Sequence, residues 1–471
     1  MTEIFSADGW LNTAITHINN VLWTYILVAA LIVCAVLFTI KTHGVQFRMI
    51  GEMIRLLGDS TKKTHEKHVS SFEAFAVSIA SRVGTGNLAG VATAIAVGGP
   101  GAIFWMWVIA LLGSATAFVE STLAQLYKRK TEGSYIGGPA YYMMFGLHKR
   151  WMARLYAVLI TITFCMAYIS IQSNTICGAM QGAFGVQPWL MGLILVVLAT
   201  ACVFGGINRI AKVSSIFVPV MAVLYILLAL VILAVNIQLV PRMFALIIEN
   251  AFGFRQFTGG TFGAMMMTGI KRGLFSNEAG MGSTPHAHAQ ANVKDPHEQG
   301  TVAMIGVFID TFIVLTLNAL VIISTLYTPG GPLAEGYTGA VTETLGKANL
   351  AQTAFGTVFG AEAGNIFVAA CLFFFAFSTI LGWNMFGKIN VIYLFGEKSV
   401  KFYNIIALVF IFLGTLASND LVWELSDMFN QLMVIPNVIA LFALTGMVTA
   451  SALHRKKEKV LMQKEEGEGD Q

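Results

Sequence analysis

Residues 82–90, Arg-Val-Gly-Thr-Gly-Asn-Leu-Ala-Gly, and residues 272–280, Arg-Gly-Leu-Phe-Ser-Asn-Glu-Ala-Gly, share one pattern: Arg, four residues, Asn, any residue, Ala, Gly. Both stretches lie in long apolar segments, where charged residues are costly. Apolar segments that glycine interrupts at corresponding positions of two halves of a chain are typical of the binding site of a secondary transporter. We therefore expect the two stretches to meet at one site.

Composition places the chain in a membrane. Of its 471 residues, 56% are hydrophobic and 11% are charged, whereas a soluble domain has about 25% charged residues. The net charge of +4 is concentrated in loops and in the C-terminal tail, which indicates membrane topology rather than nucleic-acid binding. No zinc-protease motif, nucleophile elbow or phosphate-binding loop is present in the sequence, so neither an enzyme nor a cofactor is expected.

Eleven segments are apolar and long enough to cross a bilayer, which takes about 20 residues. They are residues 21–40, 71–96, 102–127, 151–178, 188–204, 213–235, 258–286, 300–324, 364–386, 402–416 and 425–447. Lys and Arg gather in alternate connections between these segments and in the tail. The positive-inside rule then predicts a multi-pass protein of a bacterial inner membrane, with its N-terminus outside and its C-terminus in the cytoplasm.

The spans divide into two sets. Without the first span, ten remain, and each repeated stretch lies in the span that opens a set of five. Because five is odd, the two sets have opposite orientations. This predicts an all-α integral membrane fold of about 11 helices, in which a five-plus-five inverted repeat with two broken helices follows one extra N-terminal helix. The alternative is that these glycines only allow close helix packing.

Four regions follow from this division. Residues 1–70 are expected to hold the first span and an amphipathic linker at 44–57 on the cytoplasmic surface. Residues 71–240 and 241–452 are expected to be the two repeats, and residues 453–471 a charged cytoplasmic tail. A short helix is expected in the outer loop 327–363.

The breaks suit a zwitterion and a cation. Each glycine destabilises a helix by about 1 kcal/mol relative to alanine, and unwound backbone is tolerated in a membrane only inside the protein. The N-terminus of a half-helix favours a carboxylate, and free carbonyls favour a cation. An amino acid bound together with a cation would satisfy both.

The residues from Gly84 to Trp107 and from Lys271 to Gly280 closely resemble the alanine/glycine:cation symporter family, and the resemblance covers nearly the whole chain. Members of that family carry small neutral amino acids with sodium or protons, and their fold is similar to the leucine-transporter fold. The resemblance implies a substrate site whose residues come from both repeats. They are Thr85 and Gly86 for the carboxylate, Gln172 as a polar contact, Thr268, Gly269 and Phe275 at the second break for the amine, and Thr379 and Trp383 as walls.

The resemblance also implies a sodium site, made by the carbonyls of Ala80 and Val83 and the hydroxyls of Ser378 and Thr379. One position departs from the family pattern. Some members carry a bulky aromatic residue where this chain has Thr268, so a roomier pocket is expected. Alanine or glycine is the expected substrate, and serine and glutamine remain possible.

Charged residues within spans are functional by default. One interpretation is a gate, in which an Arg–carboxylate pair closes one side of the cavity; the other is a set of fixed ion pairs that brace the helices. For Glu120 and Asp310 we favour the structural role, and Asn87 and Asn277 either cap half-helices or bind the cation. The candidates for gating or structural charge are Arg82, Lys271, Arg272, Glu278, Asp310, Asn87 and Asn277.

The sequence thus predicts a secondary symporter that couples inward sodium flow to uptake of a small neutral amino acid by alternating access. It needs no cofactor, its partners are the amino acid, sodium or a proton, and the lipid bilayer, and it binds no nucleic acid. Two alternatives use the same broken-helix site: a channel-like protein, and a sensor that binds an amino acid without transporting it.

Overall fold

The computed structural model describes residues 10–22, 27–59, 69–131, 135–204, 207–252, 261–327, 331, 333 and 350–468. Within these residues the chain is almost entirely helical. The exception is a small antiparallel pair, β1 (Arg129–Lys130) and β2 (Tyr135–Ile136). The protein is therefore an all-α membrane protein in the part that the structure describes.

The N-terminal region holds four helices: α1 (Trp10–Leu22), α2 (Val28–Lys41), α3 (Val45–Arg48) and α4 (Ile50–Asp59). The predicted first span corresponds to α2, and residues 23–26 at its predicted start lie outside the described residues. The linker predicted at 44–57 is helical, but it is divided into α3 and α4 at Met49.

The predicted first repeat begins at a well-formed helix start. Ser70 Oγ accepts from Glu73 N at 3.1 Å, and a Glu73 carboxylate oxygen accepts from Ser70 N at 2.8 Å. This reciprocal pair satisfies N–H groups that every helix start leaves free. The elements that follow are α5 (Ser71–Arg82), η2 (Gly86–Gly90), α6 (Val91–Gly98), α7 (Ala102–Leu126), α8 (Pro139–Phe145), α9 (Arg150–Ile162), η3 (Thr163–Tyr168), α10 (Ile169–Phe184), α11 (Pro188–Val203), α12 (Ile207–Val235), η4 (Ile237–Leu239) and α13 (Val240–Phe252).

The rest of the chain ends in its longest described helix. Part of the predicted outer loop, residues 328–330, 332 and 334–349, lies outside the described residues, and α20 supplies a short helix near its end. The elements are α15 (Thr261–Asn277), α16 (Pro285–Gln290), α17 (Pro296–Phe308), η5 (Ile309–Leu315), α18 (Thr316–Leu326), α20 (Leu350–Phe359), α21 (Ala361–Phe395), η7 (Glu397–Ser399), α22 (Val400–Leu416) and α23 (Asn419–Glu468).

Six continuous helical stretches of the described residues are long and apolar enough to cross a membrane: Ala102–Leu126, Arg150–Phe184, Pro296–Leu326, Ala361–Phe395, Glu397–Leu416 and Asn419–Thr449. A seventh is gained if the pair Pro219–Val235 and Ile237–Phe252, bent by 80°, is taken as one span. Three shorter apolar helices, Val28–Lys41, Gly86–Gly98 and Pro188–Val203, also coincide with predicted spans. The total of eleven spans stays a prediction.

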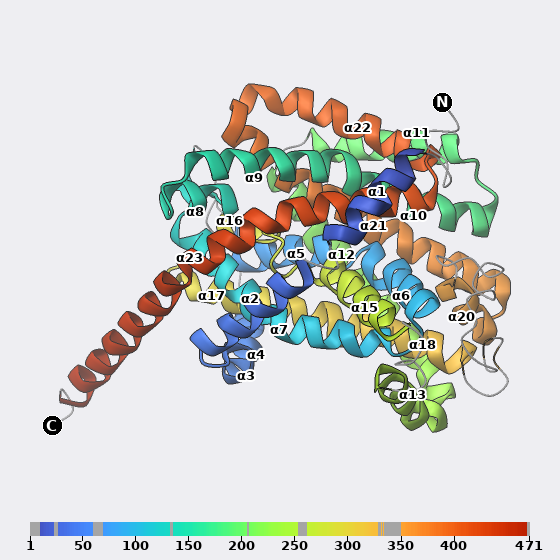
Figure 1. Ribbon diagram of the computed structural model, residues 1–471, viewed down its shortest axis with the longest axis horizontal. Coiled ribbons are helices and arrows are strands. Elements are labelled where there is room, and N and C mark those ends of the chain that lie inside the picture. The colour runs from blue at the N-terminus through green and yellow to red at the C-terminus, as the bar shows by residue number, and fades with distance from the viewer. Residues whose placement is uncertain are drawn as a thin grey trace.

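The two interrupted segments meet in the middle of the molecule. α15 packs against α6, η2 and α7, and α5 packs against α12 and α21. Figure 1 shows these helices at the centre, with α3, α4 and α8 toward one end and α13, α18 and α20 toward the other. α23 crosses the molecule and leaves it at the end that carries α3, α4 and α8. Residues 190 positions apart in the sequence are thereby brought together.

Candidate functional site

The first predicted break is present. α5 ends at Arg82, and Gly84 N donates to Arg82 O at 2.9 Å instead of continuing the helical ladder. The chain then enters the π-helical turn η2. A Cβ on Gly84 would lie 2.5 Å from Thr379 Oγ1, so only glycine allows this close approach to α21.

The second break is displaced from its predicted position. We expected it at Thr268 and Gly269, but α15 is continuous as far as Asn277, and the chain leaves the helix at residues 278–284. Glu278, Gly280 and Gly282 have φ values of 55°, 86° and 78°. The side-chain oxygen of Asn277 accepts from Ala279 N at 3.0 Å, a local turn that ends the helix.

Gly269 has a packing role instead. A Cβ there would lie 2.4 Å from Ala102 O and 2.8 Å from Trp105 Cβ, so α15 and α7 touch through this glycine. Thr268, which is half-buried, precedes Phe275 by two helical turns, or about 10 Å at 1.5 Å per residue. Their predicted position at the break was therefore wrong.

The remaining predicted substrate residues come together. Thr85 N donates to Gln172 Oε1 at 3.4 Å. A Cβ on Gly86 would lie 3.0 Å from Ser276 Cα and 3.4 Å from Phe275 Cδ1. The ring of Phe275 is in turn 6.0 Å from that of Trp383. The first break, α10, the end of α15 and α21 thus converge on one point.

Two aromatic residues that the sequence analysis missed complete this cluster. The ring of Tyr168 lies 4.5 Å from Trp383 and 5.4 Å from Phe275, and Trp423 lies 5.2 Å from Phe275. Tyr168 precedes Gln172 by four residues, so both lie on one face of the helix, a spacing that could have identified it. Trp423 is brought in from α23 only by the tertiary fold.

Within the described residues, two hydroxyls of this cluster, those of Thr85 and Tyr168, have no hydrogen-bond partner. Thr85 is fully buried, and its Oγ1 makes no hydrogen bond within the described residues. A buried hydroxyl without a partner costs about 1–3 kcal/mol. It therefore suits a ligand that accepts a hydrogen bond, and the partial positive charge at a half-helix N-terminus favours an anionic one.

The predicted sodium residues are partly assembled. Thr379 Oγ1 donates to Ala80 O at 2.7 Å, joining α21 to the last turn of α5. Val83 is fully buried beside the break. The Ser378 hydroxyl is turned toward Phe375 O of its own helix, at 2.8 Å. Carbonyls at the C-terminal end of α5 also carry the negative end of the helix dipole.

Arg82 ties the first break to the second. It is 2% exposed, and its Nε donates to Asn277 O at 2.8 Å, while its two terminal nitrogens donate to Ala303 O and Thr284 Oγ1 at 3.1 and 3.0 Å. Within the described residues it has no carboxylate in salt-bridge contact, so the predicted Arg–carboxylate pair does not involve Arg82 here. Gly306 makes room for it, since a Cβ there would lie 2.0 Å from Nη1.

The Arg–carboxylate pair is formed by the second Arg of the repeated pattern. Arg272 Nη2 contacts Asp427 Oδ2 at 2.6 Å, with the two side chains 10% and 3% exposed. The Arg272 guanidinium also lies 4.4 Å from the centre of the Trp423 ring. Lys271 interacts electrostatically with Asp427 and Glu424. The sequence analysis missed Asp427, which lies near the start of the last predicted span.

Carboxylates hold the loop of the second break. Glu278 accepts from Trp383 Nε1 at 2.7 Å and from Ser283 Oγ at 2.6 Å. Glu120 of α7 accepts from the backbone N–H groups of Gly280 and Gly282, both at 3.1 Å. The loop is thereby fixed to both halves of the chain.

Asn87 and Asp310 form a separate contact. Asn87 Nδ2 donates to Asp310 Oδ1 at 2.8 Å, which joins η2 to η5. Both residues are fully buried. In this structure Asn87 binds a carboxylate rather than capping a helix.

Comparison with known proteins identifies the family. The model of the sodium:alanine symporter family matches residues 8–468. The chain belongs to this family. The expected resemblance is thus confirmed, and since the family consists of transporters, the chain is a transporter and not an enzyme.

Three relatives illustrate the spread within the sodium:alanine symporter family. A probable sodium/glutamine symporter of Bacillus subtilis is 43% identical over 444 residues, covering 94% of this chain and 90% of the relative. An amino-acid carrier protein of the same species is 41% identical over 440 residues, covering 93% and 91%. A sodium/alanine symporter of Methanococcus maripaludis is 37% identical over 442 residues, covering 93% and 95%.

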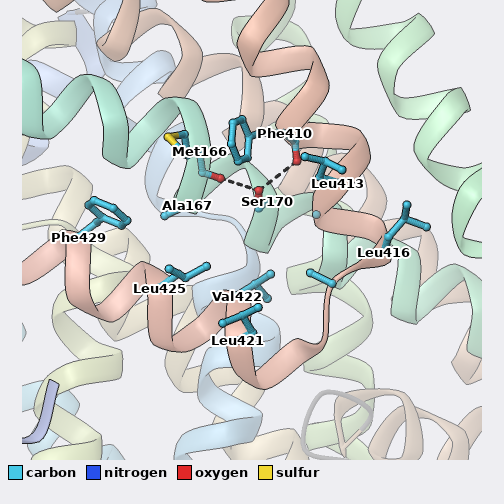
Figure 2. A pocket seen from close by; sticks show the side chains of 12 residues that line it. Met166, Ala167, Ser170, Phe410, Leu413, Leu416, Leu421, Val422, Leu425 and Phe429 are labelled. Atoms are coloured by element: carbon cyan, nitrogen blue, oxygen red, sulfur yellow. Dashed lines mark hydrogen bonds between the residues drawn. The ribbon is translucent and has the colours of Figure 1, made fainter. Parts of the chain in front are cut away.

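A nearby cavity does not suit a zwitterionic amino acid. It measures about 630 Å³ and lies between η3, α10, α22 and α23, and Figure 2 shows the side chains that line it. They are almost all apolar. Its one hydroxyl, Ser170 Oγ, lies 2.6 Å from Met166 O and 3.0 Å from Phe410 O, so it is already occupied. In this member of the sodium:alanine symporter family, the unpartnered Thr85 hydroxyl lies instead at the first break, beside Gln172.

Proposed function

We propose that the chain is a sodium-coupled symporter that takes up a small neutral amino acid, alanine or glycine first, by alternating access. The observation that carries this is the convergence of the two breaks around the unpartnered Thr85 hydroxyl. The relatives support it, since two of them are described as sodium/glutamine and sodium/alanine symporters. Serine and glutamine remain alternatives for the substrate.

The substrate is assigned to the space between the breaks. Its carboxylate is held by Thr85 and by the backbone of Gly86 at the start of a half-helix, and its ammonium group faces the C-terminal end of α15, where the helix dipole is negative. Gln172 supplies a further polar contact. Phe275 and Trp383, whose rings lie 6.0 Å apart, form walls of this space.

The coupling ion is assigned to the end of α5. The carbonyls of Ala80 and Val83 and the hydroxyls of Ser378 and Thr379 supply oxygen ligands, and unwound carbonyls at half-helix ends bind sodium in transporters with broken helices. A cation replaces the hydrogen bond between Thr379 and Ala80, so binding changes the contact between α5 and α21. Sodium and substrate thus act on neighbouring parts of one break.

Alternating access requires closure on each side. We assign the outer closure to the Arg272–Asp427 pair with Trp423, and the inner closure to the loop that Arg82 and Glu120 hold. The loop charges predict that the C-terminus is cytoplasmic. The grouping of α3, α4, α8 and the end of α23 at one end of the molecule supports this arrangement (Figure 1).

Uptake of labelled alanine into proteoliposomes tests the function. Accumulation against the alanine gradient is expected only with an inward sodium gradient, and competition by glycine, serine and glutamine ranks the substrates. Dissipative flux that no sodium gradient can drive uphill would indicate the channel. Binding of alanine without uptake would indicate the sensor.

Two variants test the pocket. Thr85→Ala and Gln172→Ala each remove one hydrogen-bonding group, and hydrogen bonds to charged groups contribute about 1.5–3 kcal/mol, or roughly 10- to 150-fold in affinity. Thr161→Ala and Gln181→Ala are matched controls, since Thr161 bonds only to its own helix in the described contacts and Gln181 is exposed. Wild-type affinity in both pocket variants would refute the assignment.

A further inference from the structure

Asn430 of α23 is a buried amide whose hydrogen-bonding groups are unused. Its side chain is fully buried, and within the described residues neither Oδ1 nor Nδ2 has a hydrogen-bond partner. No other side-chain amide in the part of the chain that the structure describes is buried with both of these atoms unpartnered. Buried polar groups are nearly always hydrogen-bonded, so an exception of this kind requires an explanation.

The face of α23 that carries Asn430 is turned toward the second break. Trp423 and Asn437 lie seven residues before and after it, close to two helical turns, so the three residues share a face. The ring of Trp423 lies 5.2 Å from that of Phe275, and Asn437 Nδ2 donates to Gly280 O at 2.9 Å. Asn430 therefore faces the segment between Phe275 and Gly280.

A second unpartnered group, the Tyr168 hydroxyl, is close to the same part of α23. Tyr168 is fully buried, and its Oη makes no hydrogen bond among the described residues. It interacts electrostatically with Asp427, which precedes Asn430 by three residues. Ser426 Oγ of α23 donates to the carbonyl of Ala167, the neighbour of Tyr168, at 3.4 Å. A buried hydroxyl and a buried amide, both unused, thus lie where η3 meets α23.

The apolar cavity does not account for these atoms. α23 presents Leu425 and Phe429 to that cavity (Figure 2), whereas Asn430 lies on the face that carries Trp423. The nearest charges on α23 and α15 are engaged with one another, since Asp427 contacts Arg272. A charged ligand group would therefore lack a free counter-charge here, and burying an unpaired charge is costly. The group that fits Asn430 is polar and neutral.

The spacing from the first break indicates the length of the ligand. Gln172 accepts from Thr85 N at the first break, and Tyr168 precedes Gln172 by four residues, or about 6 Å along the helix. A glutamine side chain, whose carboxamide follows two methylene groups, extends over a distance of this order, and the methyl group of alanine does not. A carboxamide also has a donor and an acceptor, which complement those of the Asn430 amide.

We propose that Asn430 and Tyr168 form a subsite for the side chain of the substrate, and that this subsite recognises the carboxamide of glutamine. The two amides form paired hydrogen bonds, and the Tyr168 hydroxyl supplies a third. The inference rests on the proposed function and deepens it: glutamine is carried in addition to alanine, and Asn430 determines how well it binds. Both partners lie outside the residues assigned to the carboxylate and ammonium groups of the substrate.

Competition in proteoliposomes tests the subsite. Glutamine and unlabelled alanine each inhibit sodium-driven uptake of labelled alanine, and the readout is the ratio of their inhibition constants, glutamine over alanine. Asn430→Leu removes both hydrogen-bonding groups at similar volume. Because one neutral hydrogen bond changes affinity by roughly 2- to 10-fold, the ratio should rise by roughly 5- to 100-fold. Tyr168→Phe removes one hydroxyl and should raise it by roughly 2- to 10-fold.

Two matched controls make the same chemical change elsewhere. Gln431→Met removes the amide of the next residue, whose Nε2 donates to Asn19 Oδ1 at 2.8 Å. Tyr393→Phe removes a hydroxyl that lies 3.3 Å from Met144 Sδ. Both variants should keep the wild-type ratio, and a rise equal to that in the subsite variants would overturn the proposal.

The wild type and the subsite variants supply two further outcomes. Failure of glutamine to compete in the wild type would overturn the subsite while leaving sodium-driven alanine uptake intact. Wild-type ratios in both Asn430→Leu and Tyr168→Phe would do the same. Absence of sodium-driven uptake of any amino acid by the wild type would instead refute the proposed function.

Thermal unfolding of the purified full-length protein is a second measurement, which does not require transport. Replacing a buried amide that has no partner by an apolar side chain of similar shape removes an unsatisfied polar group. Without substrate, Asn430→Leu should therefore unfold at or above the wild-type midpoint, and glutamine should raise the wild-type midpoint more than that of the variant. A midpoint well below wild type without substrate would show that Asn430 is held by partners within the protein, and an equal rise with glutamine would show that it does not contact the ligand. Either result would overturn the subsite.

Discussion

The Arg272–Asp427 pair allows a quantitative prediction about closure on the predicted outer side. Asp427→Asn keeps the size and one acceptor oxygen of the side chain but removes its charge. Breaking a buried pair by deleting one partner costs about 3–5 kcal/mol. Asparagine retains a hydrogen bond, and the contact of Arg272 with Trp423 at 4.4 Å remains. We therefore expect Asp427→Asn to reduce the free energy that this pair contributes by about 2–3 kcal/mol, near the contribution of a hydrogen bond between charged groups.

If this pair is a gate, the lost free energy makes local opening on the predicted outer side more frequent. A change of 1.4 kcal/mol is a factor of ten, so the open state should become roughly 30- to 150-fold more populated. Hydrogen–deuterium exchange in nanodiscs measures this, because amides exchange through local opening. Peptides from residues 261–277 and 419–430 should exchange faster by this factor, and those from 285–308 should not.

The control is an exposed pair of the same chemistry. Arg242 contacts Glu249 at 3.0 Å with side chains 54% and 57% exposed, and such pairs contribute about 0–1 kcal/mol. Arg242→Gln should leave exchange nearly unchanged. Exchange in Asp427→Asn within about threefold of wild type would show that our magnitude is wrong. Faster exchange in all peptides would show that the pair braces the whole protein rather than closing one side.

Two further changes test the packing and the loop. In Gly269→Ala, the new Cβ meets Ala102 O, and overpacking of this kind costs about 1–3 kcal/mol, so the midpoint of thermal unfolding should fall. The control is Gly263→Ala, whose Cβ would have no atom of another described segment within 4 Å and should not lower the midpoint. Equal midpoints in the two variants would refute the contact. In Glu120→Gln, one backbone N–H of the loop loses its acceptor, which costs about 1–3 kcal/mol. The amides of residues 278–284 should therefore exchange hydrogen for deuterium faster than in the exposed control Glu362→Gln. Equal exchange in these two variants would contradict the role of Glu120.

The first break could be predicted because its signal is local. Two glycines that flank Thr85 weaken a helix wherever they occur, and the chain leaves the helix there. The second break could not be placed from glycine alone. Gly269 looks like a helix breaker in sequence, but it faces the backbone of Ala102, a contact between distant residues that composition does not show. The local signal was about two turns further on, in the turn at Asn277 and the glycines after it.

The partners of the charged residues depended on the tertiary fold. Arg82 and Arg272 have the same offset from Asn87 and Asn277 in the sequence, yet Arg82 ends α5 at the break and Arg272 lies within α15. They also bind differently: Arg82 to carbonyls and a hydroxyl, Arg272 to Asp427. Nothing in the sequence near Arg272 identifies a residue 155 positions away. The convergence of Thr85, Gln172 and Trp383 was predicted through the family resemblance, because their spacing alone does not bring them together.

The first break divides its helix almost equally, with 12 residues of α5 on one side and 5 and 8 residues of η2 and α6 on the other. A cation that binds there from either face of the membrane has crossed about half of the transmembrane electric field. Moving one charge through the whole field is worth about 2.3 kcal/mol per 100 mV, so half the field contributes about 1 kcal/mol, or roughly fivefold in affinity. For the proposed sodium site, the place of two glycines along one helix is thus expected to make cation affinity a function of membrane voltage.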